Sequence, residues 1–125
     1  MNALVLIAHG SKRTLSNEEF VKLVDDVRKK DNKFSKVQAA FLELANPSIQ
    51  EACKELISSK ISKIFFYPYF LNTGKHVGTD LPNIIKELQN DNPSIEFVLL
   101  EHFGKSDKIS DIILDDLSLC IWNST

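Results

Sequence analysis

The sequence has no excess of charge of either sign. Its 15 lysines and arginines nearly balance 17 aspartates and glutamates, which gives a formal net charge of -2 at pH 7. No global basic field is available to attract a polyanion, which argues against nucleic acid as the main partner. Any cationic binding site in this protein must be local.

Cysteines are few and long apolar runs are missing. Cys53 and Cys120 lie far apart with no C-x-x-C spacing, which indicates neither a zinc knuckle nor a disulfide framework and suits a reducing cytoplasm. The first apolar run, "ALVLIA", has six residues, whereas roughly 20 are needed to span a bilayer. No basic segment precedes it. We therefore expect a cytoplasmic protein with no membrane partner.

The length and composition fit one domain. A chain of 125 residues, 43% hydrophobic and 26% charged, is expected to fold as a single unit over residues 1–125. Such a chain can bury a core, but it has little length left for a separate substrate domain. A large ligand would therefore require a second copy of the chain.

Short apolar runs alternate with longer amphipathic stretches along the chain. The runs cover residues 3–8, 36–42, 63–70 and 95–100. "ALVLIA" and "KIFFYPYFL" are apolar without alternation, which is typical of strands buried on both faces of a parallel sheet. The pattern predicts an α/β fold with a central parallel four-stranded sheet and helices on both faces.

The first two helices carry start signals. Ser16 is a candidate N-cap with Glu19 as its capping-box partner, ahead of an apolar stripe at helical spacing. The second helix is expected to follow Asn46 or Ser48 as the cap, with Pro47 in its first turn.

The remaining chain predicts a long loop and two further helices. Residues 69–80 are rich in Gly, Asn and Thr and are expected to be irregular; long loops in compact domains usually serve function. A third helix is predicted from about residue 80 through Asn90. The fourth helix has Ser106 as its cap. We expect its apolar residues to face inward: Ile109, Ile112, Ile113, Leu117 and Cys120 or Ile121.

Reactive side chains follow three of the predicted strands. His9 comes directly after the first strand, Glu43 after the second, and the loop after the third contains His76. Ligands of parallel α/β proteins bind at the carboxyl ends of the strands, so these three residues are expected at one edge. Two imidazoles and one carboxylate suit cobalt, iron, nickel or zinc and leave coordination positions open.

Each of these residues also has a purely structural interpretation. A lone histidine at a strand end more often serves as a hydrogen-bonding residue than as a ligand, and a lone glutamate can bond a helix N-terminus. Glu101 and His102 follow the fourth strand in the same way. For them the structural interpretation is favoured, in which they are a polar pair at the rim of the sheet before Gly104 turns the chain. The convergence of His9, Glu43 and His76 is what favours a metal site.

Cations lie beside both histidines. Lys12 and Arg13 follow His9, and Lys75 precedes His76, so carboxylates or phosphates of a ligand could be bound there. Late in the third strand, Phe70 can line a ligand surface. We therefore expect an anionic ligand at this edge.

Three segments, "LIAHGSKR", "AAFLELANPSI" and "YPYFLNTGKHVGTDLP", closely resemble the small class II chelatases, which insert cobalt, iron or nickel into sirohydrochlorin. The third is the most specific, with the pattern F-L-x-x-G-x-H-x-x-x-D-x-P. The resemblance implies a flavodoxin-like chelatase fold and, for short chains, a homodimer. It also implies that His9 and His76 bind the metal and that Glu43 is an acidic ligand or proton acceptor.

The resemblance further implies what is bound. The divalent metal ion, cobalt first and iron or nickel as alternatives, is a substrate, and no permanently bound cofactor is expected. The other substrate is sirohydrochlorin, a tetrapyrrole of cobalamin and sirohaem biosynthesis with eight peripheral carboxylates. The residues expected to line its site are Ser11, Lys12, Arg13, Phe70, Lys75 and Asp80. The segment "EHFG" departs from the Pro-Leu-Gly-like sequence of many relatives.

The residues also bear on two other functions. A phosphatase with a nucleophilic histidine is disfavoured, because such chemistry needs an arginine before the histidine and Ala8 precedes His9. A non-catalytic metal or tetrapyrrole carrier of the same fold stays open as the alternative to a chelatase.

Overall fold

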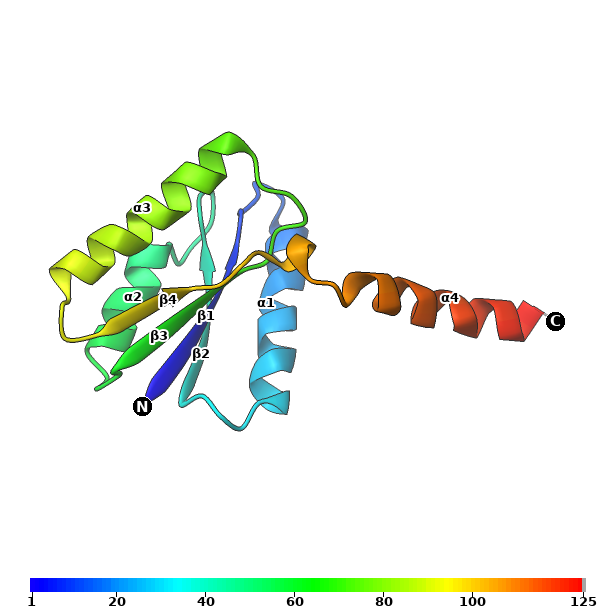
Figure 1. The fold of residues 1–125 in the computed structure, drawn as a ribbon, viewed down its shortest axis with the longest axis horizontal. Coiled ribbons are helices and arrows are strands. Elements are labelled where there is room, and N and C mark those ends of the chain that lie inside the picture. Colours follow the sequence, from blue (N-terminus) through cyan, green and yellow to red (C-terminus); the bar gives the residue numbers. More distant parts are fainter. Residues whose placement is uncertain (125) are drawn as a thin grey trace.

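Within residues 1–124, which the computed structural model describes, four parallel strands form one central sheet (Figure 1). The side chains of His76 and of residues 122–124 are outside this description. The strands lie in the order β2-β1-β3-β4. Their bounds are β1 Asn2–Ala8, β2 Lys36–Phe41, β3 Lys63–Pro68 and β4 Glu96–Leu99.

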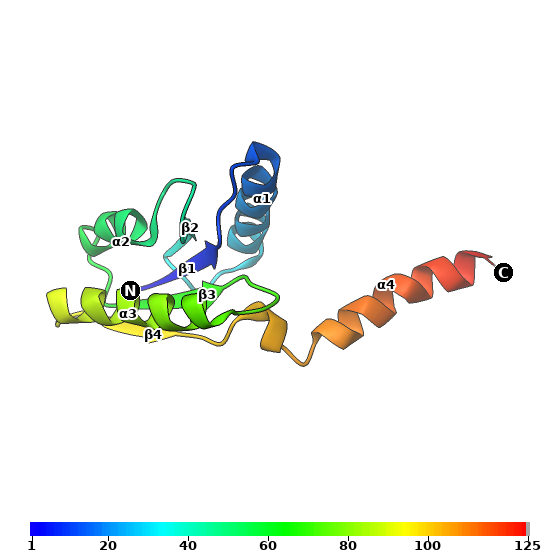
Figure 2. The ribbon, with the colours of Figure 1, turned by 90° about the horizontal axis from the view of Figure 1, so that it is seen from above.

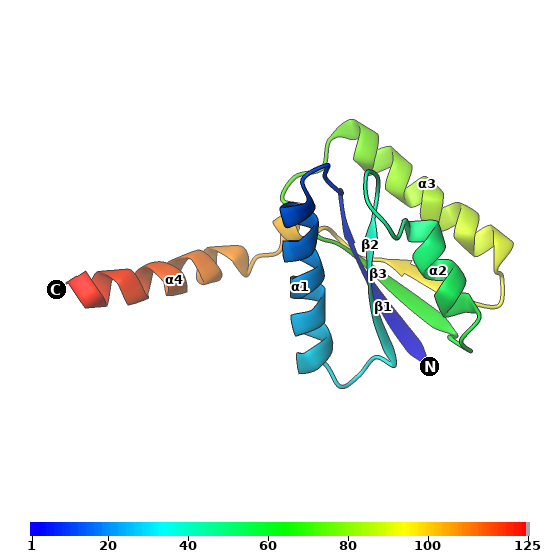
Figure 3. The same cartoon turned by 180° about the vertical axis from the view of Figure 1, so that it is seen from behind.

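The helices cover the two faces of the sheet unequally. Their bounds are α1 Thr14–Lys30, α2 Ile49–Ile57, α3 Lys75–Asp91 and α4 Ile109–Ser124, with a 3₁₀ turn, η1, at Phe103–Lys105. Figures 1 and 3 show α1 on one face and both α2 and α3 on the other. Right-handed crossovers explain this, because the chain moves one way from β1 to β2 and the opposite way from β2 to β3 and β4. The predicted α/β fold is confirmed.

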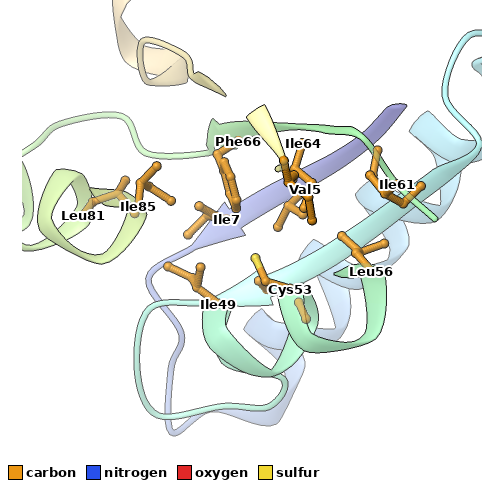
Figure 4. Packing of buried hydrophobic residues seen from close by; sticks show 14 of the residues in the cluster. Val5, Ile7, Ile49, Cys53, Leu56, Ile61, Ile64, Phe66, Leu81 and Ile85 are labelled. Atoms are coloured by element: carbon orange, nitrogen blue, oxygen red, sulfur yellow. The ribbon is translucent and has the colours of Figure 1, made fainter. Parts of the chain in front are cut away.

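The larger core lies between the sheet and the pair α2 and α3. Val5 and Ile7 of β1 and Phe66 of β3 are fully buried there (Figure 4). Cys53 of α2 packs among them and is also fully buried. Successive side chains of a strand point to opposite faces, so Leu6 belongs instead to the smaller core under α1. Both faces of β1 are therefore apolar, as its unbroken hydrophobic run predicted.

The start of α2 was predicted well and that of α1 was not. Ser48 caps α2 in a capping box: its hydroxyl accepts a hydrogen bond from the Glu51 amide at 3.1 Å. Pro47 precedes this cap, so its predicted place in the first turn was wrong. The prediction of Ser16 as the cap of α1 was also wrong, because that helix begins earlier, at Thr14.

The predicted loop over residues 69–80 is shorter than expected. α3 begins at Lys75, with Gly74 as its N-cap, and the prediction of a helix starting near residue 80 was wrong. Glycine and threonine made this segment seem irregular, but the Thr79 hydroxyl donates to the Lys75 carbonyl at 3.0 Å within the first turn. His76 and Asp80 therefore belong to α3 rather than to a loop.

The fourth helix exists, but its predicted inward packing was wrong. Figures 1 and 2 show α4 projecting away from the sheet and the other helices. Most of its described apolar side chains are exposed; Ile113, for example, is 54% accessible, whereas Ile109 is half-buried. Ser106 accepts from the Lys108 amide at 3.2 Å, ahead of the helix rather than as its N-cap. Over the described residues, no helix has the length and apolar character needed to cross a membrane.

Candidate active site

His9 stands at the carboxyl end of the central strand. It follows β1 directly, is exposed, and stacks its imidazole on the ring of Phe70, with the ring centroids 4.1 Å apart and the planes 30° apart. Phe70 is itself 2% exposed, so a ring fixed in the core supports one face of the imidazole. The other parts of the imidazole remain open to a ligand.

The backbone of Glu43 is tied to the backbone of His9. The Glu43 amide donates to the His9 carbonyl at 2.9 Å, which continues the pairing of β1 and β2 beyond the strands. Gly10 follows with a φ of +93°, and a Cβ placed on it would lie 1.7 Å from the Glu43 carbonyl oxygen. Only glycine permits this approach. The loops that carry His9 and Glu43 are thereby held side by side, while the Glu43 side chain is exposed.

The loop after His9 is shaped by Asn17, a residue that the sequence patterns did not single out. The Asn17 side chain accepts from the Ser11 amide at 3.0 Å and donates to the Ser11 carbonyl at 2.8 Å. The Ser11 hydroxyl accepts from the Arg13 amide at 3.0 Å. Ser11 therefore organises the loop, whereas Lys12 and Arg13 are exposed and take part in none of the described ion pairs.

The beginning of α3 reaches the same edge. Figure 1 shows its first turn at the same end of the sheet as the carboxyl ends of the strands. Lys75 is exposed and Asp80 is half-buried, while the predicted ligand His76 has a side chain outside the described set. Among the side chains that are described, no cluster of three His, Cys, Asp or Glu is close enough to hold a metal ion. The predicted triad of His9, Glu43 and His76 thus stays a prediction.

A cavity of about 230 Å³ that Phe70 helps to line lies between α3 and the end of β4. Glu101 and His102 line it together with Val77 and Leu81. Gly104 fixes this rim, because a Cβ there would lie 1.8 Å from the Leu71 carbonyl oxygen. Pockets that enclose a small-molecule ligand measure about 300–1,000 Å³, so this cavity is too small to enclose a large ligand.

Exposed leucines follow three of the strands at this edge. Leu44, Leu71 and Leu100 come after β2, β3 and β4 and are 56%, 69% and 39% exposed. The sequence reasoning missed them because leucine after an apolar strand reads as a continuation of the core. Exposed apolar groups beside polar ones mark binding surfaces, and such a rim suits the flat face of a ring system.

Cys53 is not available as a ligand or nucleophile. It lies in the core under α2, and burial raises the pKa of its thiol to about 12. A metal ligand or nucleophile would need the thiolate. The polar chemistry of this edge therefore rests on imidazole, carboxylate and ammonium or guanidinium groups.

The strand order and the crossovers are those of a small doubly wound α/β protein of the flavodoxin-like type, with a polar carboxyl edge. The family model CbiX matches residues 3–118, and the chain belongs to the CbiX family. The family membership that the three segments predicted is confirmed.

Similar proteins differ in length. A sirohydrochlorin cobaltochelatase of Methanocaldococcus jannaschii is 29% identical, with 92% of this chain and 96% of that protein covered. A chloroplastic sirohydrochlorin ferrochelatase of Arabidopsis thaliana is 28% identical over 96% of this chain, which spans 53% of that protein. The crystal structure of a putative cobalamin biosynthesis CbiX protein from Marinobacter aquaeolei has a TM-score of 0.84 and 24% identity, covering 98% of this chain and 99% of that one.

Proposed function

We propose that this protein is a sirohydrochlorin chelatase, a lyase-type enzyme that inserts a divalent metal ion into the macrocycle. Cobalt is the first candidate, and iron and nickel are the alternatives. Relatives named sirohydrochlorin cobaltochelatase and ferrochelatase support this assignment. The observation that carries it is the backbone hydrogen bond from the Glu43 amide to the His9 carbonyl at the carboxyl edge, together with the stacking of the His9 imidazole on Phe70.

The reaction needs a metal-binding group and a proton acceptor at the same place. As the metal ion forms bonds to the pyrrole nitrogens, two N–H bonds break and two protons leave the ring. Imidazole is largely neutral near pH 7 and can therefore ligate a metal or accept a proton. We assign metal binding to His9, His76 and Glu43, and proton acceptance to Glu43 or one of the histidines. Because the protein supplies only a few ligands, coordination positions on the metal ion stay open and the ion can be released to the macrocycle.

The second substrate is proposed to lie flat across the edge. Its carboxylates would pair with Lys12, Arg13 and Lys75, which are exposed and take part in no described ion pair. Leu44 and Leu71 would contact the apolar faces of the ring. We propose that residues 1–125 form one chelatase domain that acts in the cytoplasm. Because this edge is open, we also propose that a second copy of the chain completes the site in a homodimer.

A multiple-turnover assay tests this function. We expect the full chain, given cobalt(II) and sirohydrochlorin, to shift the absorption spectrum of the macrocycle over many turnovers per chain. His76→Ala and His9→Ala should each lower the rate at least a hundredfold with an unchanged circular dichroism spectrum. Binding of one equivalent without turnover would assign a carrier instead. Comparing the initial rates of insertion of cobalt, iron and nickel into the macrocycle identifies the preferred metal.

A further inference from the structure

The cavity between α3 and the end of β4 has polar groups that the proposed mechanism does not use. Glu101 and His102 contribute to its wall, together with the apolar residues Val77, Leu81 and Leu99. Its volume of about 230 Å³ equals that of about eight water molecules at about 30 Å³ each. The cavity can therefore hold one short side group of a ligand, but not the body of a large one.

The segment that carries His102 is held at both ends by the neighbouring strand segment. Before it, the Leu100 amide donates to the Phe66 carbonyl at 2.9 Å and extends the pairing of β3 with β4. After it, the Gly104 amide donates to the Phe70 carbonyl at 2.8 Å. Between these bonds His102 is extended, with a φ of -70° and a ψ of 157°. The backbone therefore presents His102 at a fixed place on the rim.

The His102 side chain has a hydrogen-bond donor to offer. His102 is half-buried, and within the part of the chain that the structure describes its imidazole makes no hydrogen bond or ion pair. An imidazole has at least one N–H group whether it is neutral or protonated. A donor that is partly withdrawn from water gains most from an acceptor on a ligand, because it gives up fewer hydrogen bonds to water.

The strand order decides which part of a ligand can reach His102. β1 pairs with β3 and β3 with β4, so two strand spacings, about 10 Å in all, separate the strands that lead to His9 and His102. Phe70 stacks on His9 and also lines the cavity, so both places belong to one surface. A metal ion at His9 would lie at the centre of a tetrapyrrole, among the pyrrole nitrogens. His102 would then face the periphery of the ring, where the carboxylates are.

We propose that the cavity receives one carboxylate-bearing side group of the macrocycle and that the His102 imidazole donates a hydrogen bond to its carboxylate. The methylene carbons of that group pack against Val77, Leu81 and Leu99. This inference rests on the substrate named in the proposed function, but not on metal insertion. His102 is thereby a specificity-determining residue, because a macrocycle without a carboxylate at this position leaves the donor unpaired.

Glu101 has the opposite effect on the same side group. It is exposed and lines the same cavity, so its carboxylate repels an anionic group that enters. Water and salt weaken the repulsion between exposed charges, so the effect is smaller than that of the hydrogen bond from His102. Replacing these two adjacent residues should therefore change the affinity for the macrocycle in opposite directions.

Titration of metal-free sirohydrochlorin into the full chain, followed by absorption, tests the proposal. His102→Phe keeps a flat ring but removes both nitrogens, and it should raise the Kd at least tenfold with an unchanged circular dichroism spectrum. His102→Gln keeps an N–H donor and should stay within threefold of the unsubstituted protein. Glu101→Gln should lower the Kd two- to fourfold. Glu87→Gln, an exposed position on α3, is the matched control and should leave the Kd unchanged.

The conservative variants identify the contact. A loss in His102→Phe that His102→Gln restores shows that the N–H donor matters rather than the shape of the ring. Tighter binding by Glu101→Gln shows that the group in the cavity is an anion. An unchanged Kd in His102→Phe, an equal loss in His102→Gln, or no tightening in Glu101→Gln would overturn the proposal.

Cobalt insertion measured on the same samples keeps this inference apart from the proposed function. If the macrocycle binds with the expected changes in Kd but no cobalt is inserted, the chelatase assignment fails and the carboxylate subsite stands. If insertion proceeds over many turnovers and His102→Phe binds the macrocycle normally, the subsite fails and the assignment stands. No binding of sirohydrochlorin to the unsubstituted chain refutes both.

Discussion

The imidazole of His9 stacks on Phe70 with 4.1 Å between the ring centroids, although 61 positions separate the two residues in the sequence. The contact joins an exposed residue at the end of β1 to a buried residue after β3. It limits the orientations open to the imidazole, and a side chain already held in one orientation loses less entropy when it binds a ligand.

Phe70→Leu should therefore impair catalysis as well as stability, because Phe70 also belongs to the core. Leucine keeps an apolar group under the imidazole but removes the flat surface that orients it. We expect the rate of cobalt insertion to fall about tenfold, which corresponds to about 1.4 kcal/mol of activation free energy. Steady-state kinetics and thermal unfolding measure the two effects. A variant with unchanged kcat would show that the stack does not position His9.

Glu43→Gln tests the carboxylate without disturbing its backbone. The hydrogen bond from its amide to His9 stays, as does the close contact with Gly10, so the loop should keep its shape. Loss of the negative charge and of the proton acceptor should lower the insertion rate by about 10²–10⁴-fold, the usual range for general acid–base groups. Glu87→Gln, an exposed position on α3, is the matched control and should retain full activity. Equal rates for both variants would remove Glu43 from the mechanism.

Gly10→Ala should be severely destabilising. The new methyl group would overlap the Glu43 carbonyl oxygen, and the φ of +93° adds strain of about 1–3 kcal/mol. Gly78→Ala is the control, because nothing outside its own helical turn lies within 4 Å of a Cβ placed there, and alanine favours a helix over glycine by about 1 kcal/mol. Urea unfolding should give opposite signs for the two substitutions. Equal stability of Gly10→Ala and the unsubstituted protein would contradict the close approach of the two loops.

Lys12→Ala combined with Arg13→Ala should weaken macrocycle binding without affecting the fold. Both side chains are exposed, and neither takes part in a described ion pair, so little folding free energy depends on them. We expect KM for sirohydrochlorin to rise about tenfold and its dependence on salt to decrease, because screening acts on exposed charges. Lys54→Ala on α2 serves as the control. No change in KM in the double variant would mean that other groups bind the carboxylates.

Cys53 should resist alkylation until the protein unfolds. Burial raises the pKa of its thiol from an ordinary value of 9.0 to about 12, so the thiolate is rare in the folded state at pH 8. The sign of the stability effect follows: between about pH 9 and 12 the unfolded state loses the proton first, and stability falls as the pH rises. Mass spectrometry after iodoacetamide treatment, with and without urea, checks the reactivity. Rapid native labelling of Cys53 would contradict its burial.

Sequence reasoning found the strands, included Ser48 among two candidate caps of α2, and placed His9 and Glu43 directly after strands, because each of these features depends on neighbours in the chain. It failed at α3 and α4 for different reasons. Around Gly74 and Thr79, residue preferences indicated a loop, yet a side-chain hydrogen bond and the continuing helix outweighed them. On α4, the apolar spacing identified a helix with a face to bury but carried no information on which surface covers it.

The sequence by itself determined the alternation of strands and helices and placed its polar chemistry at the strand ends, since hydrophobic periodicity is a local property. Only the tertiary structure decided that Phe70 supports His9, that Gly10 lies against Glu43 and that α4 leaves its own domain. These are contacts between distant segments, fixed by the register of β1 with its two neighbours and by packing, and no short stretch of sequence contains them.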